Sequence, residues 1–362
     1  MKIIINQNKL ISAIRLVERV VSKNISLPIL NTILLKTEGG QLQLIATNLE
    51  IGIHCSVGVK IEKEGSVAVP AKIFSDFISN VHDEKIILGV DKNIISVISE
   101  HYKTQILGMK PDEFPIVPTV RNAIEFTMPS KELSSALTSV FDATSLMETR
   151  PELSGVFIHN DGKTVTFAAT DSFRLSERIV KVATNAQKSF IIPRATALEM
   201  IHLSADHQED VKIIVSENQI ALRGSNFELV SRLIDGRYPD YKKVIPEKFI
   251  ATVTVDKAEF ERNVRMASIF SSSISDLTIK ASNATLQVMA KNSDKGEIVS
   301  NLASSGVKEP FDVSVNYRYL LDGLKTIPTS ALVIGYSGQG SPLVLQGEQH
   351  EGQVYVIMPL RA

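Results

Sequence analysis

The chain has 362 residues, of which 44% are hydrophobic and 22% are charged, as is usual for a globular protein of two or three domains. Lysine and arginine number 39 against 40 aspartate and glutamate, so the formal net charge is −1. Proteins that bind nucleic acid tightly are usually basic, because phosphate contacts dominate their affinity. Any contact of this chain with DNA is therefore expected to be local or weak.

The sequence also indicates the cellular compartment of the protein. No apolar run reaches the ~18 residues of a membrane helix, and the N-terminus lacks the apolar core of a signal peptide. The single cysteine, Cys55, excludes an intrachain disulfide and is typical of a reducing compartment. We therefore expect a cytoplasmic protein without a membrane partner.

One segment occurs three times in the chain. Leu44–Asn48 returns 123 residues later as Phe167–Asp171 and, more weakly, a further 121 residues on as Val288–Asn292. A repeat of this length is a whole domain rather than a solenoid unit, and each third is long enough to bury its own core. The predicted domains are residues 1–122, 123–247 and 248–362.

The first domain opens with a strand and an amphipathic helix. The helix is predicted because apolar residues recur at helical spacing at Leu10, Ile14, Val17 and Val21. Apolar and polar residues then alternate on both sides of a tight turn, which predicts an antiparallel strand pair at 32–36 and 41–46. The second half repeats this plan with a strand at 67–69, a helix over 72–81 and strands at 85–90 and 94–99.

The second and third domains follow the same order. In the second, Ser130 is placed as the N-cap of a helix with the stripe Leu133, Leu137, Val140 and Thr144, followed by strands 156–159, 164–168 and 190–192, a helix over 195–203 and strands 211–215 and 219–224. In the third, Asp256 and Glu259 are spaced as a capping box before Phe260, Val264 and Ala267, followed by strands 277–281, 285–289 and 311–315 and a helix over 317–324. Each domain thus reads β-α-β-β-β twice, which predicts an α+β fold with antiparallel sheets.

The motifs of common enzymes are absent from the sequence. There is no phosphate loop, no nucleophile elbow and no histidine pair at i, i+4, and one cysteine cannot build a common zinc site. Asp83 and Glu84 lie between a predicted helix and a predicted strand, so a solvated turn is the simpler interpretation. We expect no catalytic residue, no metal and no cofactor, which favours a binding or scaffolding function.

Cations lie on or beside the predicted helices, opposite or outside their apolar stripes. Each of them could belong to an ordinary solvated helix face. If the helices share one surface, such a sparse set suits loose phosphate contact without base readout. The candidate DNA-facing residues are Arg15, Arg19, Lys72, Arg194, Arg262, Arg265 and Arg318.

Five motifs in order resemble one known family. They are Leu27-Pro28-Ile29-Leu30, Ala46-Thr47-Asn48-Leu49-Glu50, Ala169-Thr170-Asp171 with Arg174-Leu175, Asp235-Gly236-Arg237-Tyr238-Pro239-Asp240-Tyr241, and Met358-Pro359-Leu360-Arg361. Each is weak alone, but together they span the chain and resemble the bacterial DNA polymerase III β subunits, the sliding clamps. The resemblance implies the DNA-clamp fold, with two helices and antiparallel sheets in each domain.

The resemblance also implies a function. Two chains would join head to tail into a pseudo-six-fold ring, loaded around double-stranded DNA by a clamp loader. The ring would tether the DNA polymerase III α subunit and other clamp-binding proteins, without enzymatic activity or a cofactor. Retention on DNA would come from topology, so a nearly neutral chain with few inward cations suits free sliding. A multidomain scaffold or sugar-binding protein, and an enzyme with a dispersed site, are the alternatives.

Partner proteins of this family insert a peptide between the second and third domains. Core packing is the alternative for Leu175 and Val244, and Phe173, Lys243 and Ile274 depart from residues common in the family. The residues implied for this cleft are Leu153, Thr170, Phe173, Arg174, Leu175, Pro239, Lys243, Val244, Ile274, Asn316, Tyr319, Met358, Pro359, Leu360 and Arg361.

Two further expectations follow from the resemblance. Lys23 or Arg150 is expected to replace DNA contacts that relatives make with other residues. Ring closure is expected through strand pairing of residues 104–107 with the stretch 268–272 of a second chain. The candidate interface residues are Thr104, Ile106, Ile269 and Phe270, with core packing as the rival interpretation.

Overall fold

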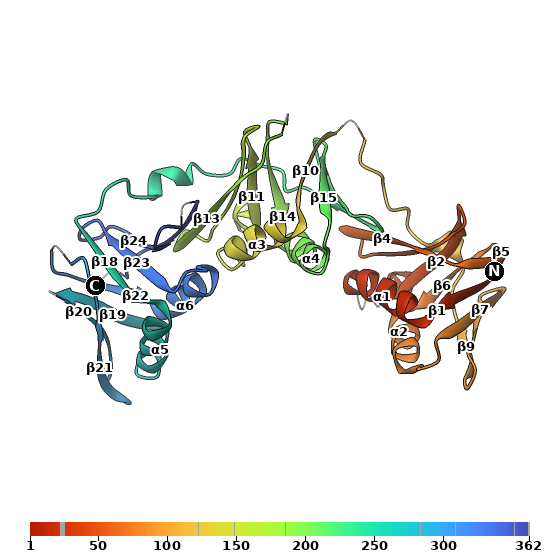
Figure 1. Cartoon of the computed structure of the whole chain (residues 1–362), viewed down its shortest axis with the longest axis horizontal. Coiled ribbons are helices and arrows are strands. Elements are labelled where there is room, and N and C mark those ends of the chain that lie inside the picture. Colours follow the sequence, from red (N-terminus) through yellow and green to blue (C-terminus); the bar gives the residue numbers. More distant parts are fainter. Residues whose placement is uncertain are drawn as a thin grey trace. The chain divides into compact units, whose positions relative to one another are not determined.

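The computed structural model describes residues 1–21, 26–121, 123–147, 149–184, 186–282, 284–307, 309–350 and 352–360. The chain forms two compact units, Met1–Lys131 with His202–Leu233, and Glu132–Ile201 with Ile234–Ala362. The described residues contain six α-helices and antiparallel strands, so the predicted α+β class is confirmed (Figure 1).

The first unit contains two antiparallel sheets. Five strands pair in the order β5-β1-β7-β8-β9, and eight pair in the order β10-β15-β16-β17-β4-β3-β2-β6. The helices α1 (Gln7–Val17) and α2 (Ala71–Asn80) pack against each other. The strands are β1 (Lys2–Asn6), β2 (Thr32–Glu38), β3 (Gln41–Thr47), β4 (Ile51–Gly58), β5 (Lys60–Lys63), β6 (Ser66–Pro70), β7 (Lys85–Asp91), β8 (Ile94–Ile98), β9 (Lys103–Leu107), β10 (Ile124–Pro129), β15 (Asp210–Val215), β16 (Gln219–Arg223) and β17 (Phe227–Arg232).

The second unit has the same plan. Eight strands pair in the order β14-β11-β12-β13-β25-β24-β23-β18, and four pair in the order β21-β20-β19-β22. The helices α5 (Lys257–Ser268) and α6 (Tyr317–Thr326) pack against each other (Figure 1). The strands are β11 (Gly155–Asn160), β12 (Thr164–Thr170), β13 (Arg174–Lys181), β14 (Lys188–Pro193), β18 (Ala251–Asp256), β19 (Asp276–Ser282), β20 (Thr285–Asn292), β21 (Gly296–Ala303), β22 (Phe311–Asn316), β23 (Ala331–Tyr336), β24 (Leu343–Gly347) and β25 (Gln353–Ile357). The two remaining helices are α3 (Ser130–Phe141) and α4 (Arg194–Ala205).

Each eight-stranded sheet joins strands from two sequence repeats. β4 of the first repeat pairs with β17 of the second, and β13 of the second pairs with β25 of the third. Backbone hydrogen bonds therefore link each repeat to the next within one sheet. Because the second repeat contributes strands to both eight-stranded sheets, the chain forms two compact units rather than three. The domain boundaries at residues 122 and 247 stay predictions.

The order of elements follows the predicted β-α-β-β-β pattern, with the additional strand β5 in the first repeat. Asp256 caps α5 as predicted, accepting a hydrogen bond from the Glu259 amide at 2.7 Å. The buried residues of α5 include Phe260 and Val264, also as predicted. The third repeat therefore encodes its first helix through both its cap and its apolar stripe.

Three details of the helix predictions are wrong. α1 ends at Val17 and continues as a 3₁₀ turn over Glu18–Val20, so Val21 lies beyond the helix. Ser130 is the first residue of α3 rather than its cap, and its hydroxyl donates to the His207 carbonyl at 2.6 Å. Thr144 lies beyond the end of α3, where its hydroxyl donates to the Phe141 carbonyl at 2.8 Å. Val21 and Thr144 thus lie in turns beyond the helices, and a tertiary hydrogen bond of Ser130 replaces the expected cap.

Candidate partner-binding site

The turn between β12 and β13 is held by two polar side chains. The Thr170 hydroxyl donates to the Arg174 carbonyl at 2.7 Å and accepts the Ser172 amide at 3.1 Å. One Asp171 carboxylate oxygen accepts the amides of Phe173 and Arg174, each at 2.9 Å. Ser172 has φ of 78°, a left-handed conformation that non-glycine residues rarely adopt, and these bonds fix it there.

The same turn occurs between β3 and β4. Thr47 donates to the Ile51 carbonyl at 3.0 Å, and one Asn48 oxygen accepts the Ile51 amide at 2.7 Å. Leu49, which corresponds to Ser172, also has φ of 78°. The repeated sequence segment therefore encodes one turn geometry that positions the start of the following strand.

Arg174 joins this turn to α6. Its Nε donates to Asp171 at 3.0 Å, its Nη1 donates to Asp322 at 2.5 Å, and its guanidinium lies 4.6 Å from the centre of the Tyr319 ring. The side chains of Arg174 and Asp322 are only 12% and 23% exposed. Burial acts to lower the pKa of Arg174, but Tyr355 and the two carboxylates raise it, and the net shift is upward. Arg174 thus stays charged and connects two elements, whereas the sequence had suggested a polar anchor at the cleft rim.

The C-terminal segment connects two sheets. β25 pairs with β13, with Ile357 opposite Arg174, and the Met358 amide then donates to the Phe173 carbonyl at 2.8 Å. Two residues later the Leu360 amide donates to the Ser314 carbonyl of β22, also at 2.8 Å. Met358 and Leu360 are consequently held at fixed positions, half-buried, between the eight-stranded and the four-stranded sheet.

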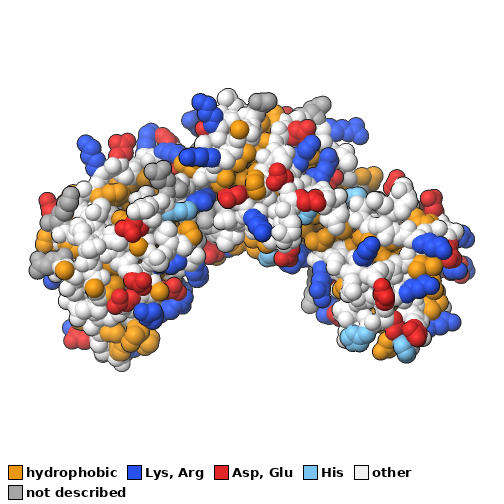
Figure 2. Space-filling model, viewed as in Figure 1, with side chains coloured by type: hydrophobic (Ala, Val, Ile, Leu, Met, Phe, Trp, Pro, Cys, Tyr) orange, Lys and Arg blue, Asp and Glu red, His pale blue; other side chains and the backbone are white. Residues whose placement is uncertain are grey.

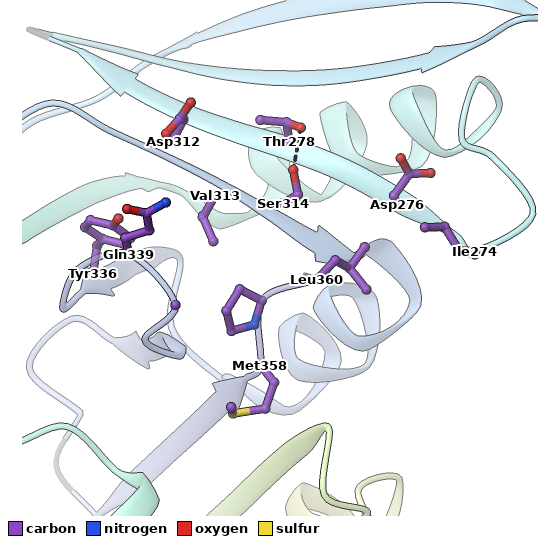
Figure 3. Close-up of a pocket in the computed structure, with 12 residues that line it drawn as sticks. Ile274, Asp276, Thr278, Asp312, Val313, Ser314, Tyr336, Gln339, Met358 and Leu360 are labelled. Atoms are coloured by element: carbon purple, nitrogen blue, oxygen red, sulfur yellow. Dashed lines mark hydrogen bonds between the residues drawn. The ribbon is translucent and has the colours of Figure 1, made fainter. Parts of the chain in front are cut away.

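A cavity of about 820 Å³ lies beside this segment. Figure 3 shows its side chains, with Leu360 facing the strands that carry Ser314 and Thr278 and the Met358 side chain pointing away from them. Four of the predicted cleft residues, Ile274, Met358, Pro359 and Leu360, belong to its wall. The remaining lining residues are Asp276, Thr278, Asp312, Val313, Ser314, Tyr336, Gln339 and Gly340, none of which the sequence had suggested.

Other predicted cleft residues lie elsewhere in the same unit. Leu153 and Leu175 are each 2% exposed within one buried cluster, so core packing is the correct interpretation of Leu175. Val244 is 42% exposed at the end of a 3₁₀ turn over Tyr241–Val244, so core packing is the wrong interpretation there.

The last members of the predicted cleft vary in exposure. Phe173 and Lys243 are exposed, and Lys243 pairs with Asp240 at 2.9 Å. Pro239 is half-buried. Asn316 caps α6 by accepting the Arg318 amide at 2.9 Å. Arg361 lies outside the described residues.

A buried carboxylate anchors the segment that contains Pro239. Glu177 on β13 is 7% exposed and accepts the Tyr241 hydroxyl at 2.5 Å and the Lys242 ammonium at 2.8 Å. Burial raises the pKa of Tyr241, and the neighbouring Glu177 raises it further. Sequence reasoning missed this anchor, although a glutamate two residues after the apolar Leu175 on one strand face indicates a buried partner.

The candidate DNA-facing cations differ in their surroundings. Arg15, Arg19, Arg262 and Arg318 are exposed, whereas Lys72, Arg150 and Arg265 form ion pairs with Asp76, Glu152 and Glu261. The guanidinium of Arg194 donates to the Phe141 carbonyl at 2.7 Å and to Thr144, and it stacks on the Phe141 ring. Lys23 lies outside the described residues. Acidic and basic side chains are mixed over the displayed face (Figure 2).

Two sheet edges carry the candidate interface residues. Thr104 and Ile106 belong to β9, the last strand of its sheet, but Ile106 is buried within its own unit. Ile269 is exposed, whereas Phe270 packs against the core of the second unit. Residues 268–272 are the end of α5 and the turn after it, so the expected strand pairing at this stretch is wrong in detail. The edge strands of the four-stranded sheet in this unit are β21 and β22.

A possible metal-ligand group occurs in the described part of the chain. Asp83, Glu100 and His101 place one ligand atom each within 4.8 Å of one another. Asp83 already accepts two hydrogen bonds from His101, from its amide at 2.9 Å and its ring at 2.7 Å. Hydrogen bonds between two loops, 18 residues apart in the chain, therefore account for the approach of Asp83 and His101. Among the described helices, none has the length and apolar character to cross a membrane.

Comparison with known families covers the whole chain. The N-terminal, central and C-terminal domain models of the DNA polymerase III beta subunit match residues 1–118, 127–240 and 242–361, in that order. The chain belongs to the DNA polymerase III beta subunit family. The resemblance seen in the sequence is thereby confirmed.

Individual family members are distant in sequence but similar in fold. The beta sliding clamps of Synechocystis sp. and Vibrio cholerae are 27% and 26% identical, each over the full length of this chain and 99% and 100% of theirs. A sliding clamp from Bartonella birtlesii, solved with griselimycin bound, is 28% identical with a TM-score of 0.94 and full coverage of both chains. One from Pseudomonas aeruginosa is 24% identical with a TM-score of 0.96. The DNA-clamp fold is therefore retained.

Proposed function

We propose that this chain is a processivity factor for DNA replication. Two copies form a closed ring around double-stranded DNA, slide along it and tether the DNA polymerase III α subunit. The observation that carries this proposal is the match of all three repeats, in order, to the three domains of the sliding clamp subunit. The proposal includes no catalytic residue and no cofactor, and it assigns the protein to the cytoplasm, where bacterial replication takes place.

Ring closure is proposed to occur between two sheet edges. β9 and β21 each end a sheet, and an edge strand presents unpaired backbone groups that another chain can use. β9, with Thr104, would pair with β21 of a second chain. Ile269 is 63% exposed and Val299 on β21 is 55% exposed, so both offer apolar area for such a contact. Two equivalent interfaces would close a ring of two chains.

DNA contact is proposed to be loose. Arg15, Arg19, Arg262 and Arg318 are exposed, while several other candidates are neutralised by neighbouring acids. Each exposed cation contributes a weak, salt-dependent phosphate contact without sequence information. Topological retention needs no stronger contact, and a stronger one would slow sliding.

Partner binding is proposed at the surface between β13, β25 and β22. Met358, Pro359 and Leu360 supply apolar contacts there, and the exposed Phe173 is hydrogen-bonded to Met358 through its carbonyl. Peptides of the polymerase, of the clamp loader and of other clamp-binding proteins would use this surface. A cavity that combines apolar side chains with a few polar groups is typical of sites that bind small ligands and short peptides.

Two measurements test this function. Static light scattering at micromolar concentration is expected to give the dimer mass, and a monomer mass would contradict the ring. After loading by the clamp loader, the protein should remain on nicked circular DNA and be lost when the circle is cut. Equal loss from circular and linear DNA would exclude topological retention.

A further inference from the structure

The 820 Å³ cavity has two chemically different walls. One consists of Met358, Pro359 and Leu360, which are apolar, and Ile274 lies beside Asp276 (Figure 3). The other is the outer face of the sheet formed by β19 and β22, where Thr278 and Ser314 are hydrogen-bonded at 2.9 Å between two aspartates, Asp276 and Asp312 (Figure 3). The polar wall thus has an uncharged centre with one carboxylate towards each end.

The two carboxylates differ in their surroundings. Asp276 accepts the amide and the hydroxyl of Ser272, at 3.0 and 2.6 Å. Burial acts to raise the pKa of Asp276, but these hydrogen bonds lower it, and the net shift is downward. Asp312 is exposed to solvent. The two aspartates therefore make this wall acidic.

No positive charge balances them from within the cavity. None of the twelve lining residues is lysine, arginine or histidine. Lys280 lies opposite Asp312 in the strand register, beside the cavity, but it is not one of the residues that line it. A ligand that fills the cavity with a neutral or acidic group leaves the two carboxylates uncompensated, whereas a cation pairs with them.

We propose that this cavity selects partner peptides that carry a lysine or arginine beside their apolar anchor. The apolar residue contacts Met358 and Leu360, and the neighbouring cation reaches Asp312 or Asp276. This inference rests on the proposed function and adds the charge of the partner at the same site. It gives the clamp a means to rank competing partners that share an apolar motif.

The size of the effect follows from the exposure of the aspartates. Ion pairs at such partly solvated positions change affinity modestly, so the lysine form is expected to bind about three- to ten-fold more tightly than the glutamate form at low salt. Salt screens charges over about 10 Å at 0.1 M, so the preference should shrink at ~0.5 M salt.

The test uses the full-length dimer and a defined probe. The probe is a fluorescent peptide with the last ten residues of the polymerase III α subunit of the same organism. Each non-apolar position is replaced in turn by lysine or by glutamate, and dissociation constants are measured by fluorescence polarisation. The protein variants are Asp312→Asn, Asp312→Asn with Asp276→Asn, and Glu348→Gln, an exposed acid outside the cavity as the matched control.

The expected result is a lysine preference at one or two adjacent positions in the wild type and in Glu348→Gln. The ratio between the dissociation constants of the glutamate and lysine peptides should fall below about two-fold in the double variant. In Asp312→Asn this ratio should lie between those of the wild type and the double variant. Equal affinity of all charge forms in the wild type would overturn the inference while leaving the proposed function intact, as would a preference that persists in the double variant. Absence of binding by every peptide would overturn the proposed partner site and this inference together.

Discussion

Replacement of Arg174 tests whether a buried ion pair holds β13 against α6. Arg174→Ala removes the guanidinium that contacts Asp171 at 3.0 Å and Asp322 at 2.5 Å. Both carboxylates then lose a charged partner in a poorly solvated place. Lys325 remains as a second partner of Asp322, at 2.9 Å. The variant should therefore be destabilised mainly through Asp171 and the stacking contact with Tyr319.

The magnitude follows from burial. A hydrogen bond to a charged group contributes about 1.5–3 kcal/mol, and removal of one partner of a fully buried pair costs about 3–5 kcal/mol. The side chain of Arg174 is 12% exposed, so its ion pair with Asp322 is largely but not fully buried. We expect the second unit to lose ~3 kcal/mol of unfolding free energy in Arg174→Ala.

Arg265 provides a matched control. Its guanidinium contacts Glu261 at 2.5 Å, the same distance as between Arg174 and Asp322, but its side chain is 55% exposed. Solvent screens such a pair, so Arg265→Ala is expected to cost about 0.5 kcal/mol or less. Burial is then the main difference between the two substitutions.

The assay combines urea denaturation with hydrogen exchange. Amides of β13 and β25 pair directly beside Arg174, so their exchange should accelerate in Arg174→Ala, while exchange in β20 and β21 stays unchanged. A double-mutant cycle with Asp322→Ala should give a coupling energy of about 1 kcal/mol or more. Equal effects of Arg174→Ala and Arg265→Ala, or a coupling near zero, would refute the argument from burial.

Three further substitutions have defined outcomes. Tyr241→Phe removes the hydroxyl that donates to buried Glu177, so urea denaturation should show a loss of about 1.5–3 kcal/mol. Asp83 has a pKa lowered to about 2 by hydrogen bonds from Ser99 and His101, and it raises the pKa of His101. In Asp83→Asn the NMR titration midpoint of His101 should therefore fall. The charged pair needs a protonated His101, which is lost as pH rises through the folded pKa of the histidine, and an ionised Asp83, which is lost as pH falls towards about 2. The variant should therefore differ most from the wild type in weakly acidic solution. Gly155→Ala places a Cβ against the Ile192 carbonyl oxygen, and the thermal unfolding midpoint should drop by several degrees.

The elements of this fold were predictable because sequence period and structure agree along most of the chain. Asp256 marks a helix start by a local rule, and the alternating strands fall within one or two residues of their predicted bounds. The role of Arg174 was not predictable, because its partner Asp322 lies 148 residues away and nothing local signals the contact. The acidic wall of the cavity escaped notice for the same reason, since Asp276 and Asp312 come to one sheet face only through strand pairing.

The repeats also show how one scaffold gives two different surfaces. Ile51 and Gly52 occupy the positions in β4 that Arg174 and Leu175 occupy in β13, after the same threonine-held turn. A Cβ on Gly52 would lie 2.5 Å from the Val117 side chain, so Val117 fills the space that the leucine side chain takes in the other copy. Without an arginine, no ion pair can form at this point of the first unit. The turn positions the following strand in both copies, whereas the residues after the turn differ. Of these two copies, only the one that precedes β13 has an arginine that connects the turn to a helix.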